Sequence, residues 1–488
     1  MPEVRMPISE QECWVTMNDG VRLDASVCTP EGAPPEGGWP GVLLIHGHGD
    51  TGSKASTLGR ARRYAGRGYL SACYSVRGQG GSEGLSFHMG AREVFDLQAM
   101  IDWALRELPV HPKRLGVAGS SQGGWHAYMA AAHHPDVATV VPENIFTDYA
   151  EFAVSDGCLA MWFFLRTMRR RVMTAGIQEL MRQWAVAGDW DLIQEWVRPT
   201  SPLLFADRVR CPVFILHGWH DVGMPPNQAL EMFQRLKVPK KLYLGGGGHE
   251  GLDSPEAQAV RQGLIDRWLD HHLKGEANGI MDEPPILYAR RPGWEHVAED
   301  AFPPADAERR WFYLGAGGKL TDRAPEGPDT HANVNNVPLR PEYTLRSAIY
   351  DDMAGVPESL AREVTPFEGE PLATPAEIVG APTFRFFVLP NRPFFQVHAE
   401  LFDVGPDGEA TLISRGHYGT RTAAPGRHAT VEIEGRTNGY RVEAGHRLRL
   451  AVSNYDTRYA FPCFEPFLAR LYHDNAHPSA VGLPMRRV

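Results

Sequence analysis

Short apolar runs bounded by glycine or proline recur through roughly the first 275 residues, and no other feature limits the fold as strongly. The runs read GVLLIHG, YLSACYSV, RLGVAG, VATVVPE, CPVFILHG and KLYLGGGG. Such runs are typical of strands buried on both faces, as in a parallel sheet covered by helices. Helical patterns separate them, most clearly at residues 91–108 and 256–274. This part of the chain predicts an open α/β sheet, preceded by a hairpin at Asn18-Asp19-Gly20.

Two later segments depart from this alternation. Residues 145–208 are rich in Trp, Met and Phe and predict several helices inserted between two strands, as a cap beyond the strand ends. From about residue 283, apolar and polar residues alternate, which predicts an antiparallel sandwich or jelly roll. We therefore expect an open α/β core of residues 1–144 and 209–282, a helical cap of residues 145–208 and an all-β jelly-roll domain of residues 283–488.

Charge and composition narrow the class of partner. The formal net charge of −10 argues against a nucleic-acid or anionic-membrane partner. No apolar segment is long enough to span a bilayer, and the N-terminal residues lack the apolar region of a signal peptide, so we expect a cytoplasmic protein. The six cysteines are scattered without CxxC spacing, which indicates neither disulfides nor a zinc site. We expect no cofactor and no metal, and the sequence leaves the oligomeric state open, a homo-oligomer included.

Two stretches match the pattern G-x-S-x-G, one around Ser121 and one around Ser82. A nucleophile elbow needs a strand that ends just before the serine and a helix that begins just after it. Ser121 has LGVAG before it and GWHAYMAAAHH after it, whereas no helix is expected after Ser82 until about residue 91. The neighbouring Ser120 lacks the glycine spacing. Ser121 is therefore the candidate nucleophile.

A serine hydroxyl needs a base, usually a histidine oriented by a carboxylate. Asp221 follows the run CPVFILHG and His249 follows KLYLGGGG, so both stand at the carboxyl ends of predicted strands. Together with Ser121 they appear in the order of an α/β hydrolase. The rival acid and the rival bases, whose places give no such order, are Glu143, His217 and His220. The sequence predicts the triad Ser121, Asp221 and His249.

Acyl transfer also needs hydrogen-bond donors that stabilise the negatively charged oxygen of the tetrahedral intermediate, the oxyanion. The backbone N–H of Gln122, at the predicted helix start, is one candidate. The loop HGHG after the first parallel strand supplies the other, with His48 as first choice and Gly49 as second. His46-x-His48 has the spacing of a metal pair, but no third ligand is near in the sequence. Packing within the cap explains its aromatic stripe more simply than a pocket does, and the candidate substrate-binding side chains there are Tyr149, Trp162 and Phe163.

Several segments resemble the CocE/NonD group of serine hydrolases, which includes X-Pro dipeptidyl-peptidases, cocaine esterase and α-amino-acid ester hydrolases. The segments are MNDGVRLDASVCTPEG, SVRGQGGSEG, SPLLFADRVRCPVFILHGWHD, RRWFYLGAGGKLT and HDNAHPSAVGLP. The resemblance runs nearly end to end. It implies an α/β-hydrolase core, an inserted helical cap and a C-terminal jelly roll, with the catalytic roles on Ser121, Asp221 and His249. Two departures concern the oxyanion hole: Gln122 stands where the group usually has tyrosine, and HGHGD contains no tyrosine.

Together these patterns predict a cofactor-free serine hydrolase that cleaves a small-molecule carboxylic ester through an acyl-enzyme. The main alternative is an X-Pro dipeptidyl-peptidase or another amide hydrolase. Carboxylates that could hold the α-ammonium group of such a substrate are Glu143, Asp148, Glu151 and Asp156. An acyltransferase, or a non-catalytic protein that binds through the jelly roll, are the further alternatives.

Overall fold

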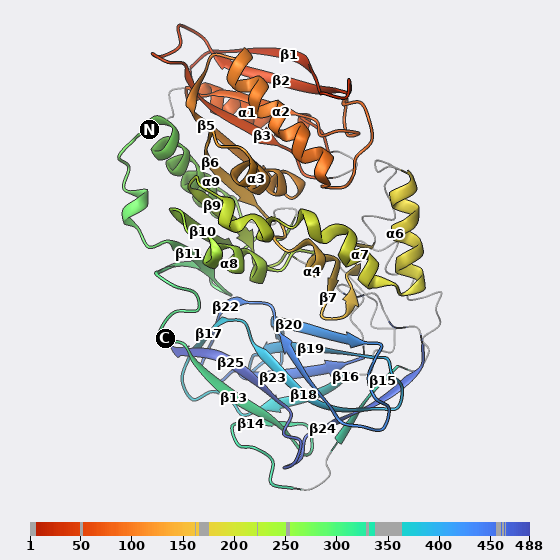
Figure 1. Ribbon diagram of the computed structural model, residues 1–488. Coiled ribbons are helices and arrows are strands. Elements are labelled where there is room, and N and C mark those ends of the chain that lie inside the picture. The colour runs from red at the N-terminus through yellow and green to blue at the C-terminus, as the bar shows by residue number, and fades with distance from the viewer. Residues whose placement is uncertain are drawn as a thin grey trace. The chain divides into compact units, whose positions relative to one another are not determined.

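The computed structural model describes residues 6–48, 52–161, 163–164, 175–221, 223–249, 254–327, 331–336, 364–454, 460, 463 and 465–488 (Figure 1). Contacts between Cα atoms divide the chain into two units. The first unit comprises Met1–Ala150 and Thr167–Leu287, and the second comprises Glu151–Arg166 and Tyr288–Val488. None of the helices among the described residues is long and apolar enough to cross a membrane.

The first unit contains a twisted sheet in which the strand order is β1-β2-β4-β3-β5-β6-β9-β10. Its strands are β1 (Ile8–Thr16), β2 (Arg22–Pro30), β3 (Trp39–Ile45), β4 (Leu70–Tyr74), β5 (Val110–Ser120), β6 (Val137–Glu143), β9 (Val213–Gly218) and β10 (Lys240–Gly245). The opening β1–β2 hairpin is antiparallel and pairs with β4, and the strands from β4 to β10 are parallel. All six apolar runs are strands, which confirms the prediction of a buried parallel sheet.

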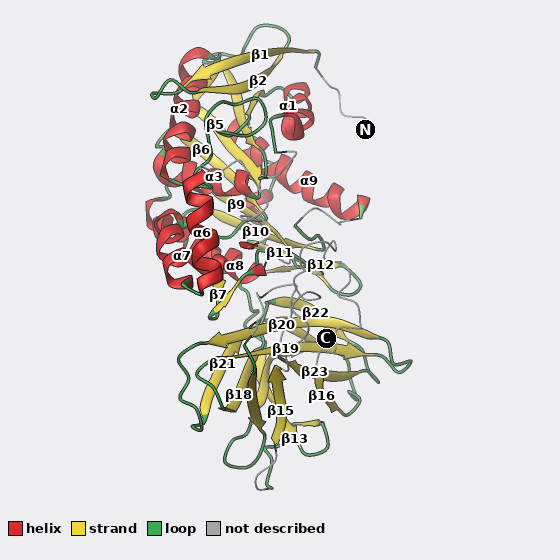
Figure 2. Ribbon diagram, turned by 90° about the vertical axis from the view of Figure 1, so that its right-hand side faces the viewer, coloured by secondary structure: helices red, strands yellow, loops and turns green. Residues whose placement is uncertain are grey.

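Helices cover both faces of this sheet. They are α1 (Ala55–Gly66), α2 (Ala91–Glu107), α3 (Gln122–His133), α8 (Pro226–Arg235) and α9 (Pro255–Leu269). Figure 2 shows α1 and α9 on one face and α2, α3 and α8 on the other. A π-helical turn, η3 (Asp270–Lys274), extends α9, and a short helix, η4 (Ile280–Asp282), follows it. The helical patterns at residues 91–108 and 256–274 thus correspond to α2 and to α9 with its extension.

The expected cap, residues 145–208, is helical in large part but is divided between the two units. Its helices are α4 (Tyr149–Ala153), α6 (Ala175–Ala187), α7 (Trp190–Val197), η1 (Arg198–Thr200) and η2 (Pro202–Arg208). A small hairpin of β7 (Val154–Ser155) and β8 (Cys158–Leu159) follows α4 and belongs to the second unit. There the carbonyl of Asp156 accepts a hydrogen bond from the N–H of Gly419 at 2.8 Å. The two short strands have no apolar periodicity, so the sequence did not indicate them.

In the described residues of the second unit, the sheet is antiparallel apart from the parallel pair of β14 with β16. Two strands, β11 (Ile286–Arg290) and β12 (Glu295–Glu299), precede it. Its strands are β13 (Glu308–Gly315), β14 (Lys319–Thr321), β15 (His331–Asn336), β16 (Val364–Gly369), β17 (Ala376–Gly380), β18 (Thr383–Pro390), β19 (Phe395–Val404), β20 (Ala410–Thr420), β21 (Ala429–Glu434), β22 (Asn438–Val442), β23 (Arg447–Ser453), β24 (Phe467–Tyr472) and β25 (Ala480–Arg487). Burial alternates residue by residue along β18, whose Phe384 and Phe386 point into the core. The prediction of a C-terminal all-β domain is confirmed.

Candidate active site

The turn between β5 and α3 has the geometry of a nucleophile elbow. Ser121 stands between the last residue of β5 and the first residue of α3 with φ 58° and ψ −127°, a left-handed conformation that is strained for a residue with a side chain. Its N–H donates to the carbonyl of Glu143 at 2.9 Å. A Cβ on Gly119 or Gly123 would overlap the carbonyl oxygen of Ile45 on β3. The two glycines of the motif are therefore required by the close approach of β3 to this turn.

Ser121, His249 and Asp221 form one hydrogen-bonded line. His249 Nε2 lies 2.9 Å from Ser121 Oγ, and His249 Nδ1 lies 2.7 Å from Asp221 Oδ2. Because the carboxylate accepts a hydrogen bond from Nδ1–H, Nε2 is left without a hydrogen and can accept a hydrogen bond from the serine hydroxyl. Asp221 Oδ1 accepts from the N–H groups of Gly223 and Met224 at 3.1 and 2.9 Å, which fixes the carboxylate.

Asp221 is fully buried, and its charge state matters for this line. Burial acts to raise the pKa of Asp221, but the charge of His249 and the hydrogen bond from it outweigh burial, and the pKa is lowered on balance. The carboxyl group therefore stays ionised at neutral pH. An ionised Asp221 can hold the imidazole in one tautomer and stabilise a positive charge that forms on it.

The rival side chains have other partners. Glu143 is 2% exposed and is bound by the guanidinium groups of Arg60, at 2.8 Å, and of Arg261. Burial acts to raise the pKa of Glu143, but the two arginines lower it on balance. His217 Nε2 contacts the carbonyl of Met224 at 2.7 Å, and His220 is exposed. His217 lies beside the line, with its Nε2 4.0 Å from Asp221 Oδ2.

Ser82, the serine of the second G-x-S-x-G match, makes hydrogen bonds to the backbone of neighbouring segments. Ser82 Oγ accepts from the N–H of Asp24 at 2.9 Å and donates to the carbonyl of Ser75 at 2.5 Å. Both bonds tie its loop to the strands beside it. Ser82 therefore contributes to the folding of that loop.

The two expected sources of oxyanion donors lie at the elbow. Gln122 is the first residue of α3, so its N–H has no acceptor within its own helix. A Cβ on Gly47 would lie 3.3 Å from Ser121 Cβ and 3.9 Å from Ser121 Oγ, which places the loop carrying His48 against the nucleophile. His46 holds this loop, since its Nε2 accepts from the N–H of Val76 at 2.9 Å and its Nδ1 donates to the carbonyl of Gly47 at 2.7 Å. Burial lowers the pKa of His46 to about 4, which keeps the ring neutral. The other candidate donor, Gly49, lies outside the described residues.

The candidate substrate-binding side chains are buried where they are described. Tyr149 is 1% exposed; its ring stacks on Phe146 with centroids 4.3 Å apart, and its hydroxyl is hydrogen-bonded to His88 Nδ1. Phe163 is 2% exposed and contacts Phe152 edge to face within the second unit. Trp162 lies outside the described residues. A role in binding stays a prediction for all three.

Two of the four carboxylates considered for an α-ammonium group are engaged within the first unit. Glu143 is bound by two arginines, as described above. Asp148 Oδ1 accepts from the N–H of Ala150 at 2.9 Å and from Ser201 Oγ at 3.4 Å. Of the others, Glu151 is exposed, and burial together with the charge of Glu434 raises the pKa of Asp156 to about 6.

Two residues beside the elbow were not singled out from the sequence. Gln79 Nε2 donates to Gln122 Oε1 at 2.9 Å, and the ring of His88 meets that of His48 edge to face with centroids 5.0 Å apart. Both belong to the loop between β4 and α2. For Gln79 the available signal was a polar side chain inside the glycine-rich segment RGQGGSEG, and His88 lies outside that segment.

Two models of known protein families together match most of the chain. The family model of X-Pro dipeptidyl-peptidase (S15 family) matches residues 19–191 and 177–251. The model of the X-Pro dipeptidyl-peptidase C-terminal non-catalytic domain matches residues 278–463. The chain belongs to the S15 family of hydrolases. This confirms the family resemblance seen in the sequence segments.

Relatives of this S15 hydrolase carry different names. A putative serine esterase of Mycobacterium bovis is 22% identical over 97% of this chain and 95% of its own length. The solved structure of an aminopeptidase from a Thaumarchaeota archaeon matches with a TM-score of 0.79 at 18% identity, over 98% of this chain and 97% of that one. A CocE/NonD family hydrolase from Staphylococcus aureus matches with a TM-score of 0.76 at 16% identity, over 99% and 98%. The structural matches establish the fold, a hydrolase-type α/β sheet with a C-terminal β domain.

Proposed function

We propose that this S15 hydrolase is a serine esterase in which Ser121 is the nucleophile, His249 the general base and acid, and Asp221 the group that orients the imidazole. One observation carries the proposal: the continuous line of hydrogen bonds from Ser121 Oγ through His249 to Asp221, at 2.9 and 2.7 Å. Ser121 also lies at a strained strand-to-helix turn, which is the setting that such a nucleophile needs.

In the proposed acylation step, Ser121 Oγ attacks the carbonyl carbon of the ester while its proton passes to His249 Nε2. The tetrahedral intermediate carries a negative oxygen, which the N–H groups of Gln122 and His48 stabilise. The intermediate collapses as the bond to the alcohol oxygen breaks, and the departing alcohol takes the proton from His249. Asp221 remains ionised and stabilises the imidazolium that exists between these transfers.

Deacylation repeats the same proton transfers with water. A water molecule gives a proton to His249 Nε2 as its oxygen attacks the acyl carbon. The second tetrahedral intermediate collapses by breaking the bond to Ser121 Oγ, which recovers its proton from the imidazole. The carboxylic acid leaves and the site returns to its starting state.

Two observations support an ester over a peptide as the substrate. The Mycobacterium relative named a serine esterase aligns over nearly the whole of both chains. In addition, Glu143 and Asp148 already have hydrogen-bonding partners within their own unit. A peptidase of the dipeptidyl type has to hold a free α-ammonium group, and these two carboxylates are committed elsewhere.

The description of the matched family, X-Pro dipeptidyl-peptidase, supports the alternative activity. The test compares kcat/KM for p-nitrophenyl butyrate with kcat/KM for Ala-Pro-p-nitroanilide. We expect hydrolysis of the ester and at most trace cleavage of the anilide. Because esters are intrinsically the more reactive, a higher kcat/KM for the anilide would establish the peptidase instead. A second pair, a free-amine and an N-acetylated aminoacyl ester, should have equal kcat/KM.

We also propose that the enzyme acts in the cytoplasm on a small-molecule ester, without a nucleic-acid partner. The net charge of −10 supports the absence of a nucleic-acid partner. Five of the six cysteines, Cys13, Cys28, Cys73, Cys158 and Cys211, form no disulfide, as is usual for proteins of a reducing compartment. Fractionation of cells that produce the chain, followed by an activity assay, tests the location, and recovery of the activity in the secreted fraction would contradict it.

A further inference from the structure

A single buried hydrogen bond links the β4–α2 loop to the residue after the nucleophile. Gln79 Nε2 donates to Gln122 Oε1 at 2.9 Å, and the two side chains are 3% and 1% exposed. Within the part of the chain that the structure describes, Gln79 Oε1 and Gln122 Nε2 have no hydrogen-bond partner. This one bond is thus the polar contact that fixes the amide group of Gln122.

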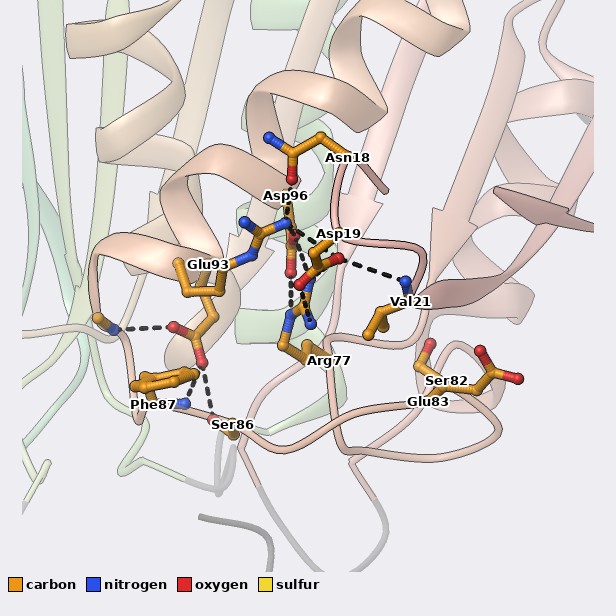
Figure 3. Close-up of polar contacts among 12 residues, drawn as sticks. Asn18, Asp19, Val21, Arg77, Ser82, Glu83, Ser86, Phe87, Glu93 and Asp96 are labelled. Carbon is orange, nitrogen blue, oxygen red and sulfur yellow. Dashed lines mark hydrogen bonds and ion pairs between the residues drawn. The ribbon is translucent and has the colours of Figure 1, made fainter. Parts of the chain in front are cut away.

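The loop that carries Gln79 is anchored at its first half by a buried arginine. Arg77 is 4% exposed, and its Nε and Nη2 donate to the two carboxylate oxygens of Asp96 on α2 at 2.6 and 2.7 Å. Its Nη1 pairs with Asp19, in the β1–β2 turn, at 2.9 Å, and Figure 3 shows Arg77 between these two carboxylates. Two-pronged pairs of this kind fix the plane as well as the position of the guanidinium. Gln79 follows two residues later, so its backbone is held close to this anchor.

The second half of the loop is anchored by a buried glutamate. Glu93 is 1% exposed and accepts hydrogen bonds from Ser86 Oγ at 2.9 Å, from the N–H of Phe87 and from the N–H of Gly90 at 3.1 Å (Figure 3). Between these contacts, His88 and Met89 have φ of 56° and 62°. Consecutive left-handed residues with side chains persist only where the surroundings hold them. The loop is therefore a rigid support and not a free surface segment.

We propose that Gln79 is a positioning residue for the oxyanion hole. Its hydrogen bond holds the Gln122 side chain, and thereby the first residue of α3, so that the Gln122 N–H points to the place where the oxyanion forms. The inference rests on the proposed function, in which that N–H is a donor. Since the oxyanion exists only in the tetrahedral state, loss of the bond should weaken binding of that state and not of the ester itself.

The variant Gln79→Met tests this with little change in side-chain length. We expect kcat for p-nitrophenyl butyrate to fall about tenfold with KM within twofold of the parent value, since misplacing one donor costs less than removing it. The inhibition constant of butylboronic acid, which forms a tetrahedral adduct with the serine, should rise by the same factor. If Gln79 had only a structural role, Gln79→Met would have a lower melting temperature than the parent. Its kcat would not fall relative to its KM.

A matched control lies in the same loop. Leu85 is 49% exposed, and Leu85→Ala should leave kcat and the boronic acid inhibition constant within twofold of the parent. Gln122→Met removes the same bond from its other end, so it reports on the bond even if Gln79→Met fails to fold. If Gln79 acts through Gln122, the double variant should be no slower than Gln122→Met alone.

Three results would overturn the inference: unchanged kcat in Gln79→Met, a rise in KM in place of a fall in kcat, or multiplicative losses in the double variant. Failure of the proposed function has a different signature. In that case Ser121→Ala would retain ester hydrolysis. A parent enzyme that depends on Ser121, together with a fully active Gln79→Met, would reject the role of Gln79 alone.

Discussion

The two units of the molecule place their buried polar side chains differently. In the first unit, β3 is buried along its whole length, and the buried polar residue His46 comes directly after the strand ends. In the second unit, β19 carries Gln396, His398 and Glu400 in mid-strand, and all three are buried. The carboxyl ends of parallel strands meet at one edge of a sheet, so polar groups there converge on one site. Polar groups distributed along antiparallel strands instead bind neighbours one by one.

The second unit contains such local networks. Glu377, on β17, is fully buried; it accepts from the hydroxyl of Tyr288 at 2.6 Å and from Arg486 Nε at 2.8 Å. A similar group joins Asp403 to Tyr440 and His446. The comparison therefore separates two kinds of polar side chain. Changes at Ser121, Asp221 and His249, which follow strand ends of the first unit, should remove activity and spare stability, and changes in the networks of the second unit should do the reverse.

The largest expected effect is that of Ser121→Ala. Loss of the nucleophile should lower kcat/KM for p-nitrophenyl butyrate by about 10⁵-fold or more, without loss of melting temperature. Ser82→Ala is the matched control, because it changes the serine of the other G-x-S-x-G match. Its hydroxyl makes two hydrogen bonds that shape a loop, so this variant should melt earlier and keep its kcat within about tenfold. A larger loss of kcat/KM in Ser82→Ala than in Ser121→Ala would refute the distinction between the two serines.

Next in size is Asp221→Asn. The amide cannot hold the imidazole in the tautomer that accepts the serine proton, so kcat should fall by about 10³- to 10⁴-fold. Glu143→Gln is the comparison, since Glu143 was the rival acid. It should destabilise the fold by leaving Arg60 and Arg261 without a carboxylate, yet lower kcat by less than about tenfold. Equal losses of kcat in the two variants would contradict the assignment of Asp221.

Glu377→Gln tests the other side of the comparison. Removing one member of a buried charged network should cost about 3 kcal/mol of unfolding free energy, read from the urea midpoint, while kcat per folded molecule stays unchanged. Glu432→Gln in the same unit is the control. Its pairing with Arg385 is largely exposed, so it should change stability by less than about 0.5 kcal/mol. A large loss of kcat in Glu377→Gln would show that the second unit takes part in the chemistry.

The smallest expected effect is a pH dependence from Asp156. Burial, with the charge of Glu434, raises the pKa of Asp156 to about 6, above its value in the unfolded chain. The folded state therefore binds the proton more tightly, and this contribution is complete below the unfolded pKa and is lost as the pH rises through 6. Because more than a third of Asp156 is exposed to solvent, which screens the effect, Asp156→Asn should raise stability at pH 8 by less than about 1 kcal/mol relative to the parent and change it little at pH 4. The same difference in stability between Asp156→Asn and the parent at both pH values would contradict this prediction.

The sequence identified the sheet and the three side chains at its edge for one physical reason. In a parallel sheet the strands are apolar throughout, so their ends are marked by a change to glycine and polar residues, as at Ser121, Asp221 and His249. The order of the strands along the chain then places these residues on the same edge. Local patterns are sufficient for such a prediction, because every member is defined by its own strand.

The parts that the sequence did not reveal depend on contacts between distant segments. The β7–β8 hairpin has strands of two residues each, too short for any periodicity. On β19, the apolar residues Phe395 and Val397 are buried, as the alternation of apolar and polar residues in this region predicts. The burial of the intervening Gln396 and His398 does not follow from alternation, because it requires cover on the second face. The bond from Gln79 to Gln122 joins the β4–α2 loop to the first residue of α3, 43 residues away along the chain, and neither segment contains a local signal for the other.

The central claim is that Ser121 is an activated nucleophile. The most direct measurement is reaction of the enzyme with a fluorophosphonate probe, followed by mass spectrometry of the labelled peptide. We predict one label per chain, on Ser121, with loss of ester hydrolysis in proportion to labelling. Labelling of Ser82 or Ser120 instead, or hydrolysis that continues at full rate in a completely labelled sample, would contradict the account.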